Sequence, residues 1–196
     1  MTEPWLQPPQ GRAADVAAAF ADAVPVIDTS RLRLRAPVLG DFPAYAEVFT
    51  SERAYYMGGP FTGEEAFADF CQGIAGWMLR GAGMWTVTLA RADVPLGWLY
   101  LWKEWGGPEP ELGWVLTVAA EGHGYAREAA FAVLPHALAL YGPNGFVSYI
   151  DAGNIRSARL AAALGAARDI AAEAQMAAQG EPDLQVWRHS GTGRAE

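Results

Sequence analysis

The chain has 196 residues, of which 52% are hydrophobic and 18% charged, so it holds enough apolar material for one core and too little charge for a disordered chain. The formal net charge is −8 and the basic residues form no run, which argues against nucleic-acid binding and favours a cationic partner or substrate. There is no leader pattern and no stretch of roughly 18 apolar residues, so we expect a cytoplasmic protein that does not bind a membrane.

Cys71 is the only cysteine, so neither an internal disulfide nor a cysteine-rich metal site can form. It lies in an apolar stripe with helical spacing, and we expect it to be a buried structural thiol. The three histidines, His123, His136 and His189, have no metal-ligating spacing. We therefore expect no metal site.

The N-terminal residues 1–27 predict an irregular arm followed by a short helix with Val16, Phe20 and Val24 on one face. Leucines and arginines then alternate strictly over 31–35. This alternation predicts a half-buried strand.

Two helices follow in the sequence. Asp41 is expected to cap the first, which runs to about Thr50. Thr62 and Glu65 have the spacing of a capping box for the second, which ends near Gly81.

The middle of the chain predicts three strands in succession, at 84–90, 96–102 and 111–118, with a turn at 93–95 between the first two. A meander of this kind predicts an antiparallel sheet. Trp105 stands in the Gly/Pro loop before the third strand, where we expect it to line a substrate entrance.

After the third strand, the sequence pattern predicts a helix over 124–141, a strand over 146–150, a helix over 155–164 and a last strand over 184–188. The intervening tract 167–183 has helical composition but stands where a strand and hairpin would be expected.

Gly122 and Gly124 lie between a predicted strand and a predicted helix. That place exposes unpaired amides and the positive end of the helix dipole, which together attract anions. Ala126 keeps the next turn small, and a bound anion would explain a cation, Arg127, in the first helical turn. An ordinary turn with Arg127 in solvent explains the glycines equally well. The sequence matches neither a P-loop nor a complete GxGxxG motif.

A second motif follows strand 146–150, where Asn154 is expected to cap a helix with Ser157 one turn in. As a pair, the two stretches resemble the GNAT acetyltransferase superfamily in its RimJ/RimL-like branch. That branch has "ELGYWL", "GKGYAxEA" and "NxxSxxxxxxLGF", and this chain has "ELGWVL", "GHGYAREA" and "NIRSARLAAALGA". The opening "LRLRAPVLGDFPAY" is similar to the family's first strand and helix.

The resemblance covers roughly 28–190, so we expect a transferase domain there, after an arm and helix over 1–27 and before a tail over 191–196. It implies an α+β fold (mixed α/β) with a central, mostly antiparallel twisted sheet flanked by helices. The sheet is splayed between strands 111–118 and 146–150, and acetyl-CoA binds in the cleft as co-substrate.

The resemblance also implies which groups hold acetyl-CoA. Backbone amides of the glycine turn hold the pyrophosphate, amides of the preceding strand hold the pantetheine and thioester carbonyl, and two side chains approach the arm and the sulfur. The residues of the glycine turn are Gly122, His123, Gly124, Tyr125, Ala126 and Arg127. Those of the strand are Val115 and Leu116. Asn154 approaches the arm and Ser157 the sulfur.

Acetyl transfer to an amine needs a base, a polarised carbonyl and an acid for the leaving thiolate. Glu111, at the start of the central strand, is the first candidate for the base, and Ser157 for the acid. Each also has a plain structural explanation, as a strand-edge carboxylate in solvent and as a locally bonded helix hydroxyl. Tyr149, Asp151 and His123 are weaker alternatives for the base.

The chain departs from the family pattern in three places. Glu121 places a negative charge near the expected phosphates and could weaken CoA affinity, Ala166 replaces a usual aromatic residue, and 167–183 shows no clear family strand.

We therefore expect an acetyl-CoA-dependent N-acetyltransferase that works by direct transfer, as a monomer or a homodimer. The acceptor is a protein N-terminal α-amine or a small-molecule amine. The alternative is an acyl-CoA-binding regulatory or sensor module without transferase activity.

Overall fold

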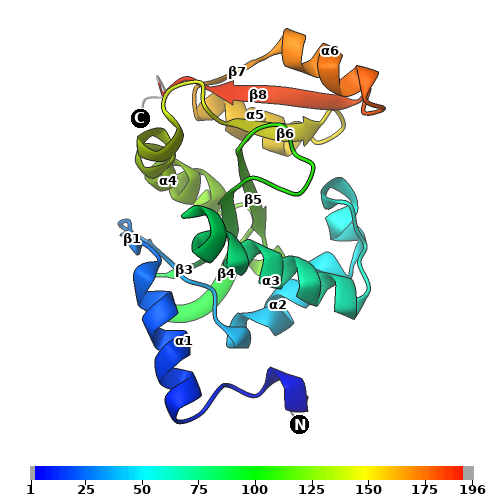
Figure 1. Cartoon of the computed structure of the whole chain (residues 1–196). Helices are drawn as coiled ribbons and strands as arrows, with labels where there is room; N and C mark the ends of the chain where they lie inside the picture. The colour runs from blue at the N-terminus through cyan, green and yellow to red at the C-terminus, as the bar shows by residue number, and fades with distance from the viewer. Residues whose placement is uncertain (1–2, 192–196) are drawn as a thin grey trace.

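The computed structural model describes residues 3–191 of the chain (Figure 1). The tail expected at 191–196 lies, apart from its first residue, outside this range. Eight strands form one sheet in the order β1-β2-β3-β4-β5-β6-β8-β7. The strands are β1 (Ile27–Asp28), β2 (Leu32–Arg35), β3 (Met84–Leu89), β4 (Ala92–Trp102), β5 (Glu111–Leu116), β6 (Val147–Asp151), β7 (Ala166–Arg168) and β8 (Leu184–His189).

Neighbouring strands of the sheet run antiparallel, with the exception of β5 and β6, which pair parallel. This mixed α+β architecture is the predicted fold class. Within residues 3–191 there are six α-helices and four short 3-10 helices, of which two precede the first strand and the others connect strands. They are η1 (Pro4–Leu6), α1 (Arg12–Ala23), η2 (Leu39–Asp41), α2 (Phe42–Phe49), η3 (Glu52–Met57), α3 (Gly63–Arg80), η4 (Val118–Ala120), α4 (Tyr125–Tyr141), α5 (Ile155–Ala163) and α6 (Ile170–Ala178).

The two faces of the sheet are covered by different helices. Side chains alternate along β4, so Leu99 and Leu101 join the core cluster beneath α4, whereas Trp98 and Tyr100 join the cluster beneath α2 and α3. Figure 1 shows β6, β8 and β7 with α5 and α6 at one end of the molecule and α1, α2 and α3 at the other, with β5 between them.

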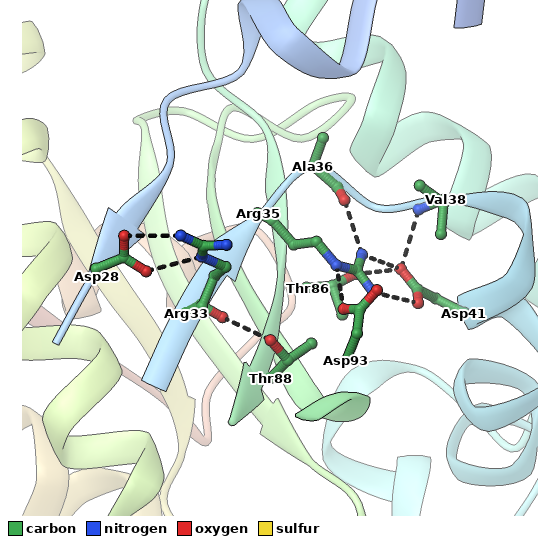
Figure 2. Close-up of polar contacts among 9 residues, drawn as sticks. All are labelled: Asp28, Arg33, Arg35, Ala36, Val38, Asp41, Thr86, Thr88 and Asp93. Carbon is green, nitrogen blue, oxygen red and sulfur yellow. Dashed lines mark hydrogen bonds and ion pairs between the residues drawn. The ribbon is translucent and has the colours of Figure 1, made fainter. Parts of the chain in front are cut away.

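The alternation predicted over 31–35 is confirmed, because Leu32 and Leu34 are fully buried. The arginines of β2 point to the other face, where Arg35 forms ion pairs with Asp41 at 2.8 Å and with Asp93 at 2.7 Å (Figure 2).

These contacts correct the expected role of Asp41. The helix begins at the next residue as predicted, but the Asp41 side chain makes no cap hydrogen bond to it. Asp41 instead accepts hydrogen bonds from the backbone N–H of Val38 and from the hydroxyl of Thr86 (Figure 2). The carboxylate of Asp41 is thus engaged in the buried ion pair with Arg35 and does not bond to the amides of the helix. By contrast, the capping box of Thr62 and Glu65 is confirmed.

The turn predicted at 93–95 is wrong. β4 already begins at Ala92, and the chain turns at Ala90 and Arg91. Pro95 lies inside β4 opposite Thr88, where the register shifts and a bulge interrupts the ladder. A proline is tolerated there because a residue at a bulge does not need to donate a backbone hydrogen bond to the neighbouring strand.

Two predictions of burial are also wrong. Cys71 is exposed, because α3 buries the face that carries Ala66, Phe70 and Gly73, and Cys71 projects beside that face. The predicted apolar face of α1 is buried only at its end. Val16 and Phe20 are 51% and 52% exposed, whereas Val24, directly after the helix, is buried.

The tract 167–183 follows its helical composition. It forms α6, which Asp169 caps by accepting a hydrogen bond from the backbone N–H of Ala172, and it connects the short strand β7 to β8. The family strand that the sequence did not reveal is β7, whose three residues are too few for a periodic pattern.

Candidate active site

The central feature of the site is the opening between β5 and β6. The two strands pair with each other at one position, where Glu111 lies opposite Val147. By contrast, β5 is paired along its length with β4, and β6 along its length with β8. At the closed end of the opening, the Ser148 hydroxyl donates to the carbonyl oxygen of Leu112 at 2.5 Å. The sheet is therefore splayed where the sequence resemblance implied.

Two cavities meet at this opening, with volumes of about 600 and 590 Å³. They share the side chains of Tyr56, Met57, Trp114, Asn154 and Ser157. We call the first the acidic cavity and the second the basic cavity, after the charged residues that line each of them. Ser157 thus stands at their junction.

The basic cavity is lined by four arginines and two glutamates, together with the glycine turn at the start of α4. These charged residues are Glu52, Arg53, Glu121, Arg127, Arg156 and Arg159. Of the arginines, Arg53, Arg156 and Arg159 were missed by the sequence reasoning. The last two stand in "NIRSARL", directly after the predicted cap residue, so their proximity to the motif was the available signal.

The glycine turn has a conformation that only glycine adopts freely. Gly122 and Gly124 have φ of +79° and +77°. A β-carbon at Gly122 would meet no protein atom within 4 Å, and one at Gly124 would meet only the end of the Arg31 side chain at 3.7 Å. Packing within the protein therefore leaves open space over the amides at the positive end of α4, which is suited to an anion.

Arg31, directly before β2, contacts this turn from the side of the sheet. Its guanidinium donates to the carbonyl oxygen of His123 at 3.1 Å, pairs with Glu128 of α4 at 2.6 Å and lies 4.9 Å from the ring centroid of Tyr125. The His123 ring stacks on Tyr125 and lines neither cavity. His123 can thus contribute its backbone to an anion site, but its ring is poorly placed to act as a base.

Glu121 does not present a free negative charge to the turn. Its carboxylate pairs with Arg53 at 2.5 Å and with Arg156 at 3.1 Å. Partial burial raises the pKa of Glu121, but hydrogen bonds and charge from the two arginines outweigh burial and hold it below its ordinary value. The charge expected to weaken anion binding is therefore compensated by two cations from η3 and α5.

The backbone of β5 presents alternating groups to the opening. Gly97 of β4 lies opposite Leu116 of β5. One residue further on, Thr117 donates its N–H to the carbonyl oxygen of Leu96, so the amide of Thr117 points towards β4. Because amides alternate along an antiparallel strand, the N–H of Leu116 faces the opening and that of Val115 faces β4. The geometry thus favours Leu116 as a backbone donor, whereas Val115 contributes a wall of the basic cavity.

Ser157 is oriented by its neighbours. Asn154 caps α5 as predicted, since its side-chain oxygen accepts from the Ser157 N–H at 3.2 Å. The indole N–H of Trp114 donates to the Ser157 hydroxyl oxygen at 3.3 Å across the opening. With one lone pair engaged by Trp114, the Ser157 hydroxyl can direct its proton towards a leaving group at the junction of the cavities.

The acidic cavity is lined by six carboxyl side chains and by no lysine, arginine or histidine among the described residues. These are Asp69, Glu104, Glu109, Glu111, Asp151 and Glu181. Trp105, which is 93% exposed, also lines this cavity, and its expected role at a substrate entrance stays a prediction.

Glu111 is half-buried in this cavity at the closed end of the splay. Burial and then the charge of Glu104 raise the pKa of Glu111 to about 7, against the opposing effect of the Tyr149 backbone and the Trp102 side chain. A carboxyl group that titrates near neutral pH can accept a proton from an ammonium group and release it to water.

The alternative bases are less suited. Burial raises the pKa of Tyr149 to about 12, so its hydroxyl stays protonated at neutral pH. Asp151 lines the acidic cavity, but one of its carboxylate oxygens accepts from the N–H of Gly153 at 2.7 Å.

Comparisons with known proteins show the family and the fold of the chain. The model of the acetyltransferase (GNAT) domain matches residues 31–167. A crystal structure of the acetyltransferase from Agrobacterium tumefaciens str. C58 is 32% identical, with a TM-score of 0.76 over 85% of this chain and 94% of that chain. None of the curated proteins compared with the chain matches it.

RimL, the ribosomal L7/L12 alpha-N-protein acetyltransferase, shares the fold at lower identity. Its apo structure is 18% identical, with a TM-score of 0.64 over 85% of this chain and 94% of that chain. Its structure in complex with coenzyme A is 17% identical, with a TM-score of 0.62 over 85% of this chain and 98% of that chain.

Within residues 3–191, no group of three or more His, Cys, Asp or Glu side chains is arranged to hold a metal ion. In the same range, the helices are too short or too polar to cross a membrane.

Proposed function

Because the chain belongs to the GNAT acetyltransferase family, we propose that it transfers an acetyl group from acetyl-CoA directly to a primary amine. The observation that carries this proposal is the junction of two oppositely charged cavities at the splay between β5 and β6. A donor in one cavity and an acceptor in the other meet beside Ser157 and Glu111.

The basic cavity fits the donor. The amides of Gly122, Gly124, Tyr125, Ala126 and Arg127 offer a cradle for the pyrophosphate, and the surrounding arginines supply positive charge. The amide group of Asn154 can bond to the pantetheine arm, and the arm would lie along β5 as an added strand does. When bound, acetyl-CoA supplies the acetyl thioester.

The residues of this chain supply the proton transfers. Glu111 takes a proton from the acceptor ammonium, directly or through a water molecule. The N–H of Leu116 polarises the carbonyl oxygen, and the Ser157 hydroxyl, held by Trp114, supplies a proton to the departing sulfur.

The test has a binding step and a turnover step. Acetyl-CoA at 100 times its dissociation constant should stabilise the protein by about 2.7 kcal/mol, a rise of several degrees in Tm. Desulfo-CoA should do nearly the same, because most contacts go to phosphate and pantetheine. Release of free CoA thiol is then followed with a panel of peptide N-termini, diamines, monoamines and aminoglycosides.

Thiol release with at least one amine supports the proposal. Absence of a Tm shift with millimolar acetyl-CoA contradicts the donor assignment. Binding without turnover of any amine instead supports the acyl-CoA-binding sensor.

A further inference from the structure

Resting on the proposed function, we infer that the acceptor is a small amine with at least two positive charges, an α,ω-diamine or a linear polyamine. Its reacting nitrogen lies at Glu111, and its second nitrogen is bound by Asp69 and Glu104 in the acidic cavity. A protein N-terminus, whose single α-ammonium is followed by neutral peptide groups, would leave the second carboxyl pair without a partner.

The first step of the argument is that these carboxyl groups have no cation of their own. Asp69, Glu104 and Glu111 form no ion pair with another described residue, whereas Glu109 in the same cavity is paired with Arg188 at 2.7 Å. Outside the cavity, seven carboxylates of the described residues have an arginine partner, and the others lie elsewhere on the protein without one. The seven are Asp28, Asp41, Asp93, Glu121, Glu128, Asp169 and Glu173.

The second step is that the unpaired carboxyl groups act on one another. Partial desolvation of the carboxyl group and then the charge of Asp69 raise the pKa of Glu104, which lies in an exposed loop. Burial and then the charge of Glu104 raise the pKa of Glu111. Like charges that interact in this way are stabilised by a cation placed between them. Asp69, Glu104 and Glu111 line the same cavity, and Glu104 is close enough to interact with each of the other two. We call these three residues the row of carboxyl groups.

Asp69 is held in place from behind. The Tyr45 hydroxyl donates to its carboxylate, and the Tyr100 hydroxyl donates to Tyr45 at 3.1 Å. Tyr45 is fully buried, so this chain fixes the Asp69 carboxylate at the wall of the cavity. A fixed carboxylate binds a cation with less loss of side-chain freedom than a mobile one.

The third step concerns the walls between the charges. Aromatic rings from several segments line the cavity, and they can contact both methylene groups and ammonium groups. They include Phe49, Tyr56, Phe61, Tyr100, Trp102 and Trp105. A volume of about 600 Å³ is within the range for small-molecule sites, so a flexible chain of a few methylene groups fits inside it.

The reaction balances with this acceptor. Glu111 removes one proton from the reacting ammonium, its nitrogen forms the amide bond to the acetyl carbon, and the carbon–sulfur bond breaks. The second proton of this nitrogen is taken up through the Ser157 hydroxyl, which gives its own proton to the departing sulfur to form the CoA thiol. The first proton, held by Glu111, passes to solvent. The acetylated product carries one positive charge fewer than the substrate, so the acidic cavity binds it less strongly and releases it.

The test compares kcat/KM in the thiol-release assay for 1,4-diaminobutane, spermidine, 1-aminobutane and 4-amino-1-butanol, each corrected for its neutral fraction. Peptides with a free N-terminus are measured alongside. We expect the diamine and the triamine to exceed the monoamines by about tenfold or more, the factor of one charge-assisted hydrogen bond.

The variants Glu104→Gln and Asp69→Asn should each lower the ratio of diamine to monoamine towards one. Glu104 lies in an exposed loop, so its substitution tests the inference even where Asp69→Asn disturbs folding. The matched control is Glu47→Gln, which removes a carboxylate on α2 that lines neither cavity and should leave the ratio unchanged.

Equal kcat/KM for diamines and monoamines, or a preference for peptides, overturns the inference but leaves the acetyltransferase proposal intact. Absence of thiol release with every amine overturns both.

Discussion

The acidic and basic cavities have nearly the same volume but opposite charge, and they are built in different ways. The basic cavity depends on backbone amides and on residues close in sequence to two short motifs, Gly122 to Arg127 and Asn154 to Arg159. The acidic cavity depends on side chains from α3, η3, the loop between β4 and β5, the strands β5 and β6, and the segment before β8. In the proposed function, the donor is therefore bound mainly by two short motifs, to which the fold adds Arg53 of η3, and the acceptor is bound by residues from many segments.

This difference separates two tasks of the protein. Every acetyl-CoA molecule has the same phosphates and arm, so a fixed backbone cradle suffices for the donor. Acceptors differ, and side chains on loops can change without disturbing the sheet. We expect substitutions in the basic cavity to alter donor affinity and substitutions in the acidic cavity to alter acceptor choice and proton transfer.

The largest effect is expected at Glu111. Glu111→Gln should lower kcat/KM by about 10² to 10⁴ at neutral pH, the usual contribution of a positioned base. Wild-type activity should rise with pH through about 7, where Glu111 loses its proton, whereas the variant should recover only as the amine itself becomes neutral. Rates measured from pH 6 to 10 for both proteins test this. Identical pH profiles would remove Glu111 as the base.

Ser157→Ala should have the next largest effect. Because a thiolate leaves more readily than most groups, we expect kcat to fall by about 10- to 100-fold at every pH, with little change in donor affinity. Trp114→Phe, which removes the indole N–H that orients the Ser157 hydroxyl, should lower kcat by less. Calorimetric titration with acetyl-CoA is the control. If donor affinity falls as much as kcat, the serine serves packing or cofactor binding.

A third prediction concerns the glycine turn. Gly122→Ala should weaken acetyl-CoA binding by about tenfold, because a β-carbon stands over the amides and disfavours the positive φ. The matched control is Gly81→Ala, at the end of α3, with φ of +70° and no protein atom within 4 Å of the added carbon. Both variants should lose similar stability, but only the first should lose affinity. Equal affinity in the two variants would make the turn purely structural.

The smallest expected effect is a gain of stability in Glu111→Gln. The pKa of Glu111 is raised in the folded protein, so its ionisation opposes folding, and wild-type stability decreases as pH rises from about 4.5 through about 7. Glutamine carries no charge, so the ligand-free variant should be more stable by roughly 1 kcal/mol at pH 8, a few degrees in Tm, and by little at pH 4. A variant less stable than wild type at pH 8 would contradict this.

The sequence by itself determined features that depend on neighbouring residues. These include the capping box of Thr62 and Glu65, the cap of α5 by Asn154 and the glycine turn before α4. Each rests on a backbone conformation or a hydrogen bond within a few residues, which adjacent side chains fix. The motifs around them sufficed to predict the family and the splayed sheet.

The tertiary structure decided what depends on distant segments. Arg53 compensates Glu121 across 68 positions of the chain, Arg35 turns Asp41 away from its helix, and the row of carboxyl groups from Asp69 to Glu111 joins α3 to β5. Ion pairs and pKa values follow from the charges and the burial that the fold brings together, and neither is set by spacing in the sequence. The motifs therefore predicted where acetyl-CoA should bind, whereas the charge of the acceptor site emerged only once the sheet was assembled.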